Sequence, residues 1–425
     1  MNASPSYNLY RPDIDGLRAI AVLSVILFHA QLSCSGGFVG VDIFFVISGY
    51  LITRIVQRDL ESHRFSILEF YQRRIRRIFP AFFAMLLVSA VLGLWLLPPD
   101  ELQDLGKSMV GASTFCSNIF SFHRSGYFDN SSIYQPLLHT WTLSIEEQFY
   151  IFWPLILAVL SISLLARWKL WLVFLILGAS LLLSCYLVNH DGNAAFYLLP
   201  SRAWELTLGS VLSIAPFPQL LGRMPRLTAH VMSILGLLML ATSITLYNSS
   251  ILYPGLAALA PCLGTMFIIA AGEGGSSLGG SILSELPLVH IGRISYSLYL
   301  WHWPILVFAR VFVNGELSLV QRYGCVAITV IISWLSWRFV ESPFRNPKII
   351  EGQSRIWVVG GLVTAALFTV LGIVLFSSEG FPQRSPEVAR WVAEQRNDYS
   401  IFTRSPCMAW KESLPPVHGC LLGAG

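Results

Sequence analysis

The fold class follows from the segment Asp15-Gly-Leu-Arg-Ala-Ile-Ala-Val-Leu-Ser-Val-Ile-Leu-Phe-His-Ala-Gln31, the first long apolar run of the chain. Its length approaches the about 20 residues that a helix needs to cross a bilayer. It nevertheless contains an arginine, Arg18, and a histidine, His29. Eleven helical steps turn by about 1100° and rise by about 16 Å, so the two side chains lie on one helix face, about half a bilayer apart.

Two interpretations of this pair are open. Ionisable groups inside a membrane span are costly and usually face a cavity or a partner, which makes Arg18 and His29 candidate functional residues. Alternatively, each side chain extends to the nearer membrane surface and has no further role.

The composition predicts an all-α polytopic membrane protein. The 425 residues are 54% hydrophobic and 12% charged, with a mean hydropathy of +0.62. Soluble domains carry about 25% charged residues. The net charge of +4 does not indicate a nucleic-acid partner, because the basic residues are concentrated in a few short loops. Membrane lipids are therefore the expected surroundings.

Eleven segments are long and apolar enough to be predicted as spans. The connections rich in Lys and Arg alternate with poor ones, which predicts a cytoplasmic N-terminus and an outside C-terminus in a bacterial inner membrane. The long connection 98–140 is expected to be a polar loop over the outer mouth of a cavity. The predicted spans are 15–33, 41–56, 78–97, 141–162, 168–188, 202–216, 229–247, 251–271, 288–311, 321–340 and 355–376.

The seven cysteines show no CxxC or zinc-ribbon spacing, so no metal site is predicted. Cys407 and Cys420 lie in the tail that is expected outside the membrane. An oxidising compartment would allow them to form a disulfide.

The second span opens with the glycine-rich stretch Gly37-Phe-Val-Gly-Val-Asp-Ile-Phe-Phe-Val-Ile-Ser-Gly-Tyr-Leu-Ile52. Its polar residues Asp42 and Ser48 need partners at membrane depth. A close approach to the first span would bring Asp42 to His29, where a carboxylate could orient the imidazole. A seam for close helix packing is an equally good interpretation of the glycines.

A run of arginines, Arg73, Arg74, Arg76 and Arg77, precedes the third span. Guanidinium groups bind phosphates through paired, charge-assisted hydrogen bonds, so this run is a candidate phosphate site. From the run alone, a topology anchor that contacts anionic lipids is the favoured interpretation, and the two uses are compatible.

Three further groups of polar residues lie within predicted spans. Glu146 and Glu147 are adjacent and point about 100° apart, so one is expected to face the cavity and the other to serve structure. Arg202 and Glu205 can pair at i,i+3. His302 is interpreted as an interfacial histidine in an aromatic belt.

The ordered set of these motifs resembles the acyltransferase-3 superfamily of bacterial membrane acyltransferases, in particular the branch that includes O-antigen O-acetyltransferases. The matching segments cover residues 10 to about 345. They are Arg18-x10-His29, Phe38–Tyr50, Arg73–Pro80, Thr140–Tyr150, Arg202–Glu205 and Ser295–Pro304.

The resemblance implies a bundle of about ten helices in residues 1–345 that forms the acyltransferase domain. It implies a linker and an additional membrane helix in residues 346–376, followed by a periplasmic SGNH hydrolase-like domain. Residues 377–425 contain no Gly-Asp-Ser-x block, so we expect a linker there and an absent or truncated SGNH domain.

The resemblance also implies transfer of an acetyl group from cytoplasmic acetyl-CoA to a hydroxyl of a periplasmic glycan, such as lipid-linked O-antigen of lipopolysaccharide. Arg18 and the arginine run would bind the donor. His29 would act as a general base or as a nucleophile. Asp42, Ser48 and one of the two glutamates would orient it. A transporter or flippase of lipid-linked sugars is the alternative.

Overall fold

The computed structural model describes residues 10–124, 133–275, 277–345 and 354–384, and these form helices and no strand. The predicted Cys407–Cys420 pair lies outside the described residues. The helices are α1 (Pro12–His29), α2 (Gly40–Glu61), α3 (Ile67–Leu96), α4 (Pro99–Ser113), α5 (Ser117–Phe122), α6 (Thr140–Leu160), α7 (Ser163–Ala166), α8 (Lys169–His190), α9 (Gly192–Tyr197), α10 (Leu199–Val211), α11 (Phe217–Leu221), α12 (Arg226–Leu246), α13 (Leu259–Glu273), α14 (Leu278–Leu283), α15 (Leu286–Val313), α16 (Leu319–Leu335), α17 (Ser342–Arg345) and α18 (Ser354–Ser377).

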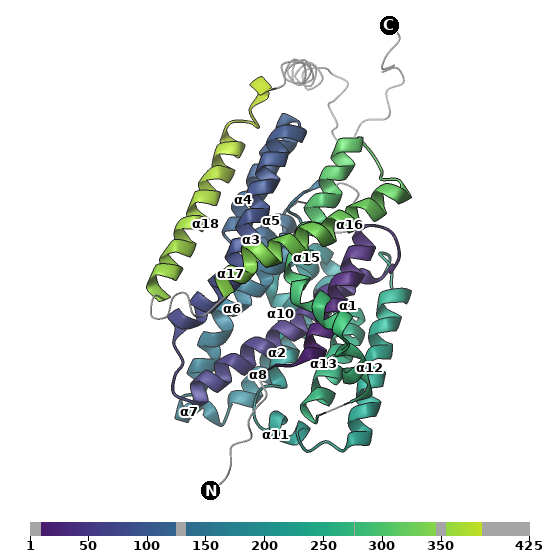
Figure 1. Cartoon of the computed structure of the whole chain (residues 1–425). Coiled ribbons are helices and arrows are strands. Elements are labelled where there is room, and N and C mark those ends of the chain that lie inside the picture. The colour runs from purple at the N-terminus through teal and green to yellow at the C-terminus, as the bar shows by residue number, and fades with distance from the viewer. Residues whose placement is uncertain (1–9, 125–132, 276, 346–353, 385–425) are drawn as a thin grey trace, which may run out of the picture.

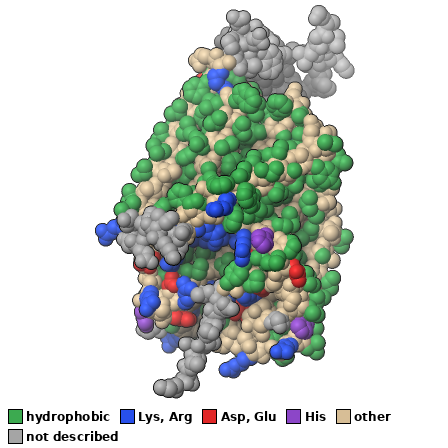
Figure 2. Space-filling view, in the orientation of Figure 1, with side chains coloured by type: hydrophobic (Ala, Val, Ile, Leu, Met, Phe, Trp, Pro, Cys, Tyr) green, Lys and Arg blue, Asp and Glu red, His purple; other side chains and the backbone are tan. Residues whose placement is uncertain are grey.

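The described helices confirm the prediction of an all-α polytopic membrane protein. Eight of them are long and apolar enough to cross a membrane. Hydrophobic side chains cover most of the face shown in Figure 2, whereas Lys, Arg, Asp and Glu gather in its lower part. This separation is the one expected of a bundle whose middle faces lipid.

Helices α1 and α15 pack along each other near the centre of the bundle (Figure 1). We call the end of the bundle where α1 begins the arginine end, and the end where α1 finishes the histidine end. At the arginine end the two backbones approach closely: a Cβ atom on Gly292 would lie 1.9 Å from the carbonyl oxygen of Asp15. A Cβ on Gly16 would lie 2.0 Å from the carbonyl oxygen of Leu283, in α14. Glycine is therefore required at both positions for α1 to reach its place.

The predicted span at 202–216 is wrong. The structure has α10 there, a helix of 13 residues that is about 20 Å long, too short for a hydrocarbon core of about 30 Å. α10 instead packs closely on α2, because Gly209 and Gly49 allow the backbones to touch: Cβ atoms there would lie 1.9 Å from Val46 O and 1.7 Å from Leu206 O. The glycines of α2 thus do form a packing seam.

Two connections differ from their predicted form. α3 begins at Ile67, so the arginines at 73–77 lie on a helix rather than in a loop. The connection expected to be a loop at 98–140 contains α4 and α5. α4 packs against α18, where Gly106 faces the backbone of Gly372. α3, α4 and α18 therefore form one side of the molecule (Figure 1).

The α1–α15 contact can be tested with one substitution. We expect Gly292→Ala to destabilise the protein by about 1–3 kcal/mol, because the added methyl group has no room against the Asp15 carbonyl. The measurement is thermal unfolding in detergent. A matched control is Gly178→Ala in α8, where nothing lies within 4 Å of the new Cβ. That variant should be more stable by about 0.5–1 kcal/mol, the gain expected for Ala over Gly within a helix. Equal effects of the two substitutions would contradict this account.

Candidate active site

Two buried histidines meet at the histidine end of α1 and α15. Nδ1 of His29 lies 2.9 Å from Nε2 of His302, and the two rings stack with centroids 5.2 Å apart. His302 is fully buried, at 0% exposure. The interpretation of His302 as an interfacial residue was therefore wrong: it is the hydrogen-bond partner of His29, a role that the sequence had suggested for Asp42.

The hydrogen bonds determine which nitrogen of His29 is basic. Nδ1 of His302 lies 2.6 Å from the carbonyl oxygen of Tyr299 and 3.2 Å from that of Leu298. A carbonyl oxygen only accepts, so this Nδ1 carries the hydrogen. In a neutral ring Nε2 of His302 then accepts, and Nδ1–H of His29 donates to it. His29 therefore presents Nε2 as the nitrogen that can take up a proton.

Residues of α15 also hold His29 from the side. The indole of Trp303 packs edge-on against the imidazole, with centroids 4.6 Å apart. A guanidinium nitrogen of Arg310 donates to the backbone carbonyl of His29 at 2.9 Å. His139 is buried nearby, with its ring centroid 5.8 Å from that of His302. Packing on several sides leaves His29 one orientation.

A cavity of about 210 Å³ lies between α1, α2, α3, α6 and α15. Five of the residues singled out in the sequence line it: Arg18, Ser48, Arg74, Arg77 and Glu146. Residues from four different helices are thus brought to one space. Glu147 does not line it, in agreement with the 100° between neighbouring residues of a helix.

Two arginines of this cavity, Arg74 and Arg77, form no direct ion pair in the described part of the chain, although the carboxylate of Glu146 lines the same cavity. Among the described residues, no carboxylate lies within ion-pair distance of Arg74 or Arg77. The Arg74 guanidinium lies 3.9 Å from the ring centroid of Tyr150, whose hydroxyl donates to Glu146 at 2.8 Å. Arg18 has only a long pairing of 3.6 Å with Asp15. These half-buried guanidinium groups without a direct carboxylate contact favour an anionic ligand.

Tyr299 connects the cavity to the histidines. It lines the cavity together with Thr142, and their hydroxyl oxygens are 2.6 Å apart. The Tyr299 hydroxyl donates to the carbonyl of His139 at 3.0 Å, and its ring lies 5.4 Å from that of His302. The cavity therefore ends one aromatic ring away from the histidine pair.

A second polar cavity of about 380 Å³ lies at the histidine end, between α4 and residues 134–136. The carbonyl of Gln135 in its wall accepts from the indole nitrogen of Trp303 at 2.8 Å, and Trp303 packs on His29. His29 is thus connected to this second cavity through Trp303 and Gln135. The polar residues that line this second cavity are Glu101, Asp104, Ser108, Arg124, Tyr134 and Gln135.

The structure does not bring every predicted residue to the site. Arg73 points away from the cavity and pairs with Asp59 at 2.8 Å. Arg76 donates to the carbonyl of Phe344 and lies over the ring of Trp357. On a helix, residues of one run face different sides, so only half of the four-arginine run reaches the cavity.

Asp42 lies in a separate buried cluster and does not contact His29. It pairs with Arg202 at 3.2 Å and accepts a hydrogen bond of 2.5 Å from the Tyr253 hydroxyl. Arg202 also pairs with Glu205 at 2.9 Å, which confirms the predicted i,i+3 pair. Asp42 was expected to orient His29, and this expectation was wrong because α2 turns that carboxylate toward α10 and α13.

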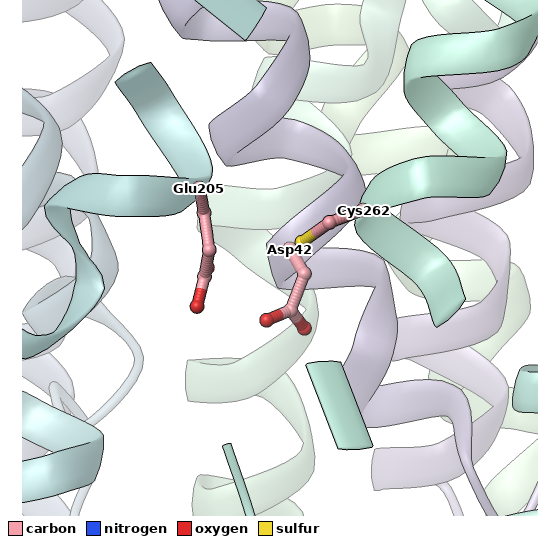
Figure 3. A group of neighbouring side chains, drawn as sticks. All are labelled: Asp42, Glu205 and Cys262. Atoms are coloured by element: carbon pink, nitrogen blue, oxygen red, sulfur yellow. The ribbon is translucent and has the colours of Figure 1, made fainter. Parts of the chain in front are cut away.

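Figure 3 shows that Asp42, Glu205 and Cys262 converge, and their ligand atoms lie within 4.8 Å of one another. Two carboxylates and a thiol are suitable donors for a divalent cation. However, the Arg202 guanidinium already lies within ion-pair distance of both carboxylates and supplies the positive charge. The structure therefore assigns this cluster to ion pairing between α2 and α10.

Sequence reasoning missed three residues of the site: His302, Tyr299 and Arg310. The signal for His302 was present, because a histidine within a long apolar helix is as unusual as His29. Arg310 carried the same signal, because it lies within the predicted span 288–311, whereas Tyr299 did not. Their roles depend on the packing of α15 against α1 and α6.

Comparison with known proteins places the sequence of this chain in a family. The family model described as an acyltransferase domain matches residues 11–338. The peptidoglycan O-acetyltransferase OatA of Listeria monocytogenes is 36% identical over 357 residues, covering 80% of this chain and 57% of the relative. The O-acetyltransferase OatA of Staphylococcus aureus is 32% identical over 349 residues, covering 79% of this chain and 57% of the relative. No solved structure matches the chain.

The ion cluster predicts a specific pattern of stability. Arg202→Met should destabilise the protein by about 3–5 kcal/mol, because it leaves two buried carboxylates without a cation. Adding Asp42→Asn and Glu205→Gln to that variant should restore most of the melting temperature in detergent, since no buried charge then remains unpaired. A triple variant less stable than Arg202→Met would contradict the ion-pair assignment.

Proposed function

This chain belongs to the acyltransferase family, and we propose that it transfers an acetyl group from cytoplasmic acetyl-CoA to a hydroxyl of a bacterial cell-envelope glycan. The names of the relatives support acetyl as the group transferred. The Listeria relative is named for peptidoglycan, whereas the motifs of this chain favour O-antigen, so both glycans are candidate acceptors. One observation carries the proposal: a cavity lined by three arginines, Arg18, Arg74 and Arg77, ends one aromatic ring away from the histidine pair.

The cavity with Arg18, Arg74 and Arg77 is the proposed donor site. CoA carries several phosphate charges, and guanidinium groups without carboxylate partners match them. The thioester of acetyl-CoA lies at the end of a long, unbranched chain, which suits a narrow cavity that reaches Tyr299 and Thr142. The Lys and Arg distribution supports an arginine end in the cytoplasm, so the donor would enter from that side of the inner membrane.

The second polar cavity, at the histidine end, is the proposed acceptor site. Carboxylates, an amide and the Tyr134 ring offer hydrogen bonds and a stacking surface to a sugar. This cavity would open to the outside if the arginine end is cytoplasmic. This chain spans 57% of the length of each of these two relatives.

His29 is the proposed general base. Its Nε2 takes the proton of the glycan hydroxyl while that oxygen attacks the thioester carbonyl. The carbon–sulfur bond then breaks, and the CoA thiolate takes the proton back from the imidazolium. His302 positions His29 by accepting its Nδ1–H.

We predict that Arg77→Ala weakens CoA binding by about tenfold to a hundredfold, the loss expected for charge-assisted hydrogen bonds of about 1.5–3 kcal/mol. The measurement is the rise in melting temperature of the purified protein with CoA or acetyl-CoA. Arg73→Ala is the matched control, because Arg73 belongs to the same run but points away from the cavity. Equal loss in both variants would argue against the donor site. Stabilisation by sugars or ions but not by CoA would favour a transporter.

We predict that His29→Ala abolishes acetylation and that His302→Phe lowers it by about 10²–10⁴-fold, the usual contribution of a positioned base. Phe keeps the ring stacked on His29 but removes the acceptor nitrogen. The measurement is mass and linkage analysis of envelope glycans from cells that express each variant at equal levels. Full acetylation with His29→Ala would exclude the proposed mechanism.

The same variants separate a base from a nucleophile. Radiolabelled acetyl-CoA without acceptor should leave no label on the protein if His29 acts only as a base. Stable label that disappears in His29→Ala would instead show an acyl-imidazole intermediate.

A further inference from the structure

A polar cavity separate from both proposed substrate sites lies at the arginine end. It has a volume of about 440 Å³ and lies where the ends of α2 and α6 meet the start of α8, at the lower left of Figure 1. It shares no lining residue with the donor cavity. Its lining residues are Gln57, Leu60, Glu61, Ser161, Ala166, Arg167, Lys169, Leu170, Ile214 and Ala215.

The hydrogen bonds of the Lys169 ammonium in this cavity go to neutral groups, and the Glu61 carboxylate acts on it only at longer range. It donates to Oε1 of Gln57 at 3.0 Å and to the hydroxyl of Ser161 at 3.0 Å. Within the described part of the chain, no carboxylate lies within 4 Å of Lys169 or of Arg167. An ammonium group has three donors, so one remains for a ligand. The cavity therefore offers two cations to an anion.

Gln57 supplies a second, independent sign of a ligand. The residue is only 8% exposed, and its Nε2 is buried without a hydrogen-bond partner. A buried amide nitrogen almost always has a partner, because leaving it unpaired is costly. Its oxygen is already bound by Lys169, so the free Nε2 lies next to the ammonium. The amide and the ammonium can donate to one oxyanion.

The cavity also contains a carboxylate, Glu61. It is exposed and forms no ion pair with Lys169 or Arg167. Cations and an anion that line one cavity without pairing are complementary to a zwitterion. Phosphoethanolamine is such a group, since it carries a phosphate and an ammonium two carbons apart.

The position of the cavity indicates that the ligand comes from the membrane. α8 begins at Lys169, and only 17% of its most apolar segment is buried inside the bundle. Trp171, Leu175 and Leu182 on its surface are 72%, 65% and 72% exposed. Tryptophan is enriched at the level of lipid head groups. Acyl chains could therefore lie along α8 with the head group at Lys169.

We propose that this cavity binds the head group of a phosphoethanolamine phospholipid. The phosphate accepts from Lys169, Arg167 and Nε2 of Gln57, and the lipid ammonium pairs with Glu61. This inference does not depend on the proposed transferase function, because none of these residues belongs to the substrate cavities.

Native mass spectrometry of the full chain in delipidating detergent tests the proposal. Phosphatidylethanolamine, phosphatidylglycerol and phosphatidylcholine of equal chain length are added in turn, and retained lipid is counted. We expect phosphatidylethanolamine to be retained best. Lys169→Gln should lower its retention about tenfold, the loss expected for a charge-assisted hydrogen bond. Glu61→Gln should abolish the preference over phosphatidylglycerol while leaving both lipids bound.

Arg223→Ala is the matched control, because Arg223 is an exposed cation outside this cavity. It should retain lipid as the unmodified chain does. Glycerophosphoethanolamine and inorganic phosphate, which lack acyl chains, should compete weakly. Strong competition by phosphate alone would contradict the proposal and show that the cavity binds a soluble anion. Unchanged preference in Lys169→Gln and Glu61→Gln would overturn the proposal. If Lys169→Gln does not fold, Glu61→Gln and the lipid series on the unmodified chain still decide the result.

Discussion

The hydrogen bond between His29 and His302 is the constraint on which the site depends. It exists because α1 and α15 pack closely, and that packing requires glycine where Asp15 and Gly292 meet. The carbonyl of Tyr299 then sets the tautomer of His302, and His302 sets that of His29. The glycine contact at one end of the bundle therefore helps to set which histidine nitrogens carry hydrogens at the other end. The same helix pair lines the donor cavity.

The buried charges of the bundle divide into two kinds. Arg202 is surrounded by Asp42, Glu205 and aromatic rings, so its charge is neutralised within the protein and it holds helices together. Arg74 and Arg77 are half-buried in the donor cavity, and no carboxylate of the described residues lies at ion-pair distance from them. Because a charge without a direct partner is costly within a membrane protein, such arginines favour an anionic ligand. This difference, rather than burial itself, separates the structural arginines from the proposed binding ones.

The sequence predicted most of the long helices and part of the site. Apolar length identified α2, α3, α6, α8, α12, α13, α16 and α18 as spans, since that property is local. Helical periodicity correctly separated Glu146 from Glu147 and paired Arg202 with Glu205. The span at 202–216 was wrong, because a buried α10 has the same apolar composition as a lipid-facing helix while being too short to cross. The motifs also indicated the acyltransferase family, which the family match confirms.

The sequence by itself determined that the protein lies in a membrane, where most of its helices are, and that ionisable residues such as Arg18 and His29 lie within them. Hydropathy and helical spacing are properties of consecutive residues. Only the tertiary structure decided which of these residues meet. Asp42 pairs with Arg202 rather than His29, and His302 takes the place beside His29. Two of the four arginines in the run turn toward the cavity and two do not. Partner choice depends on helix rotation and crossing, which close glycine contacts between distant segments set and which no single stretch of sequence contains.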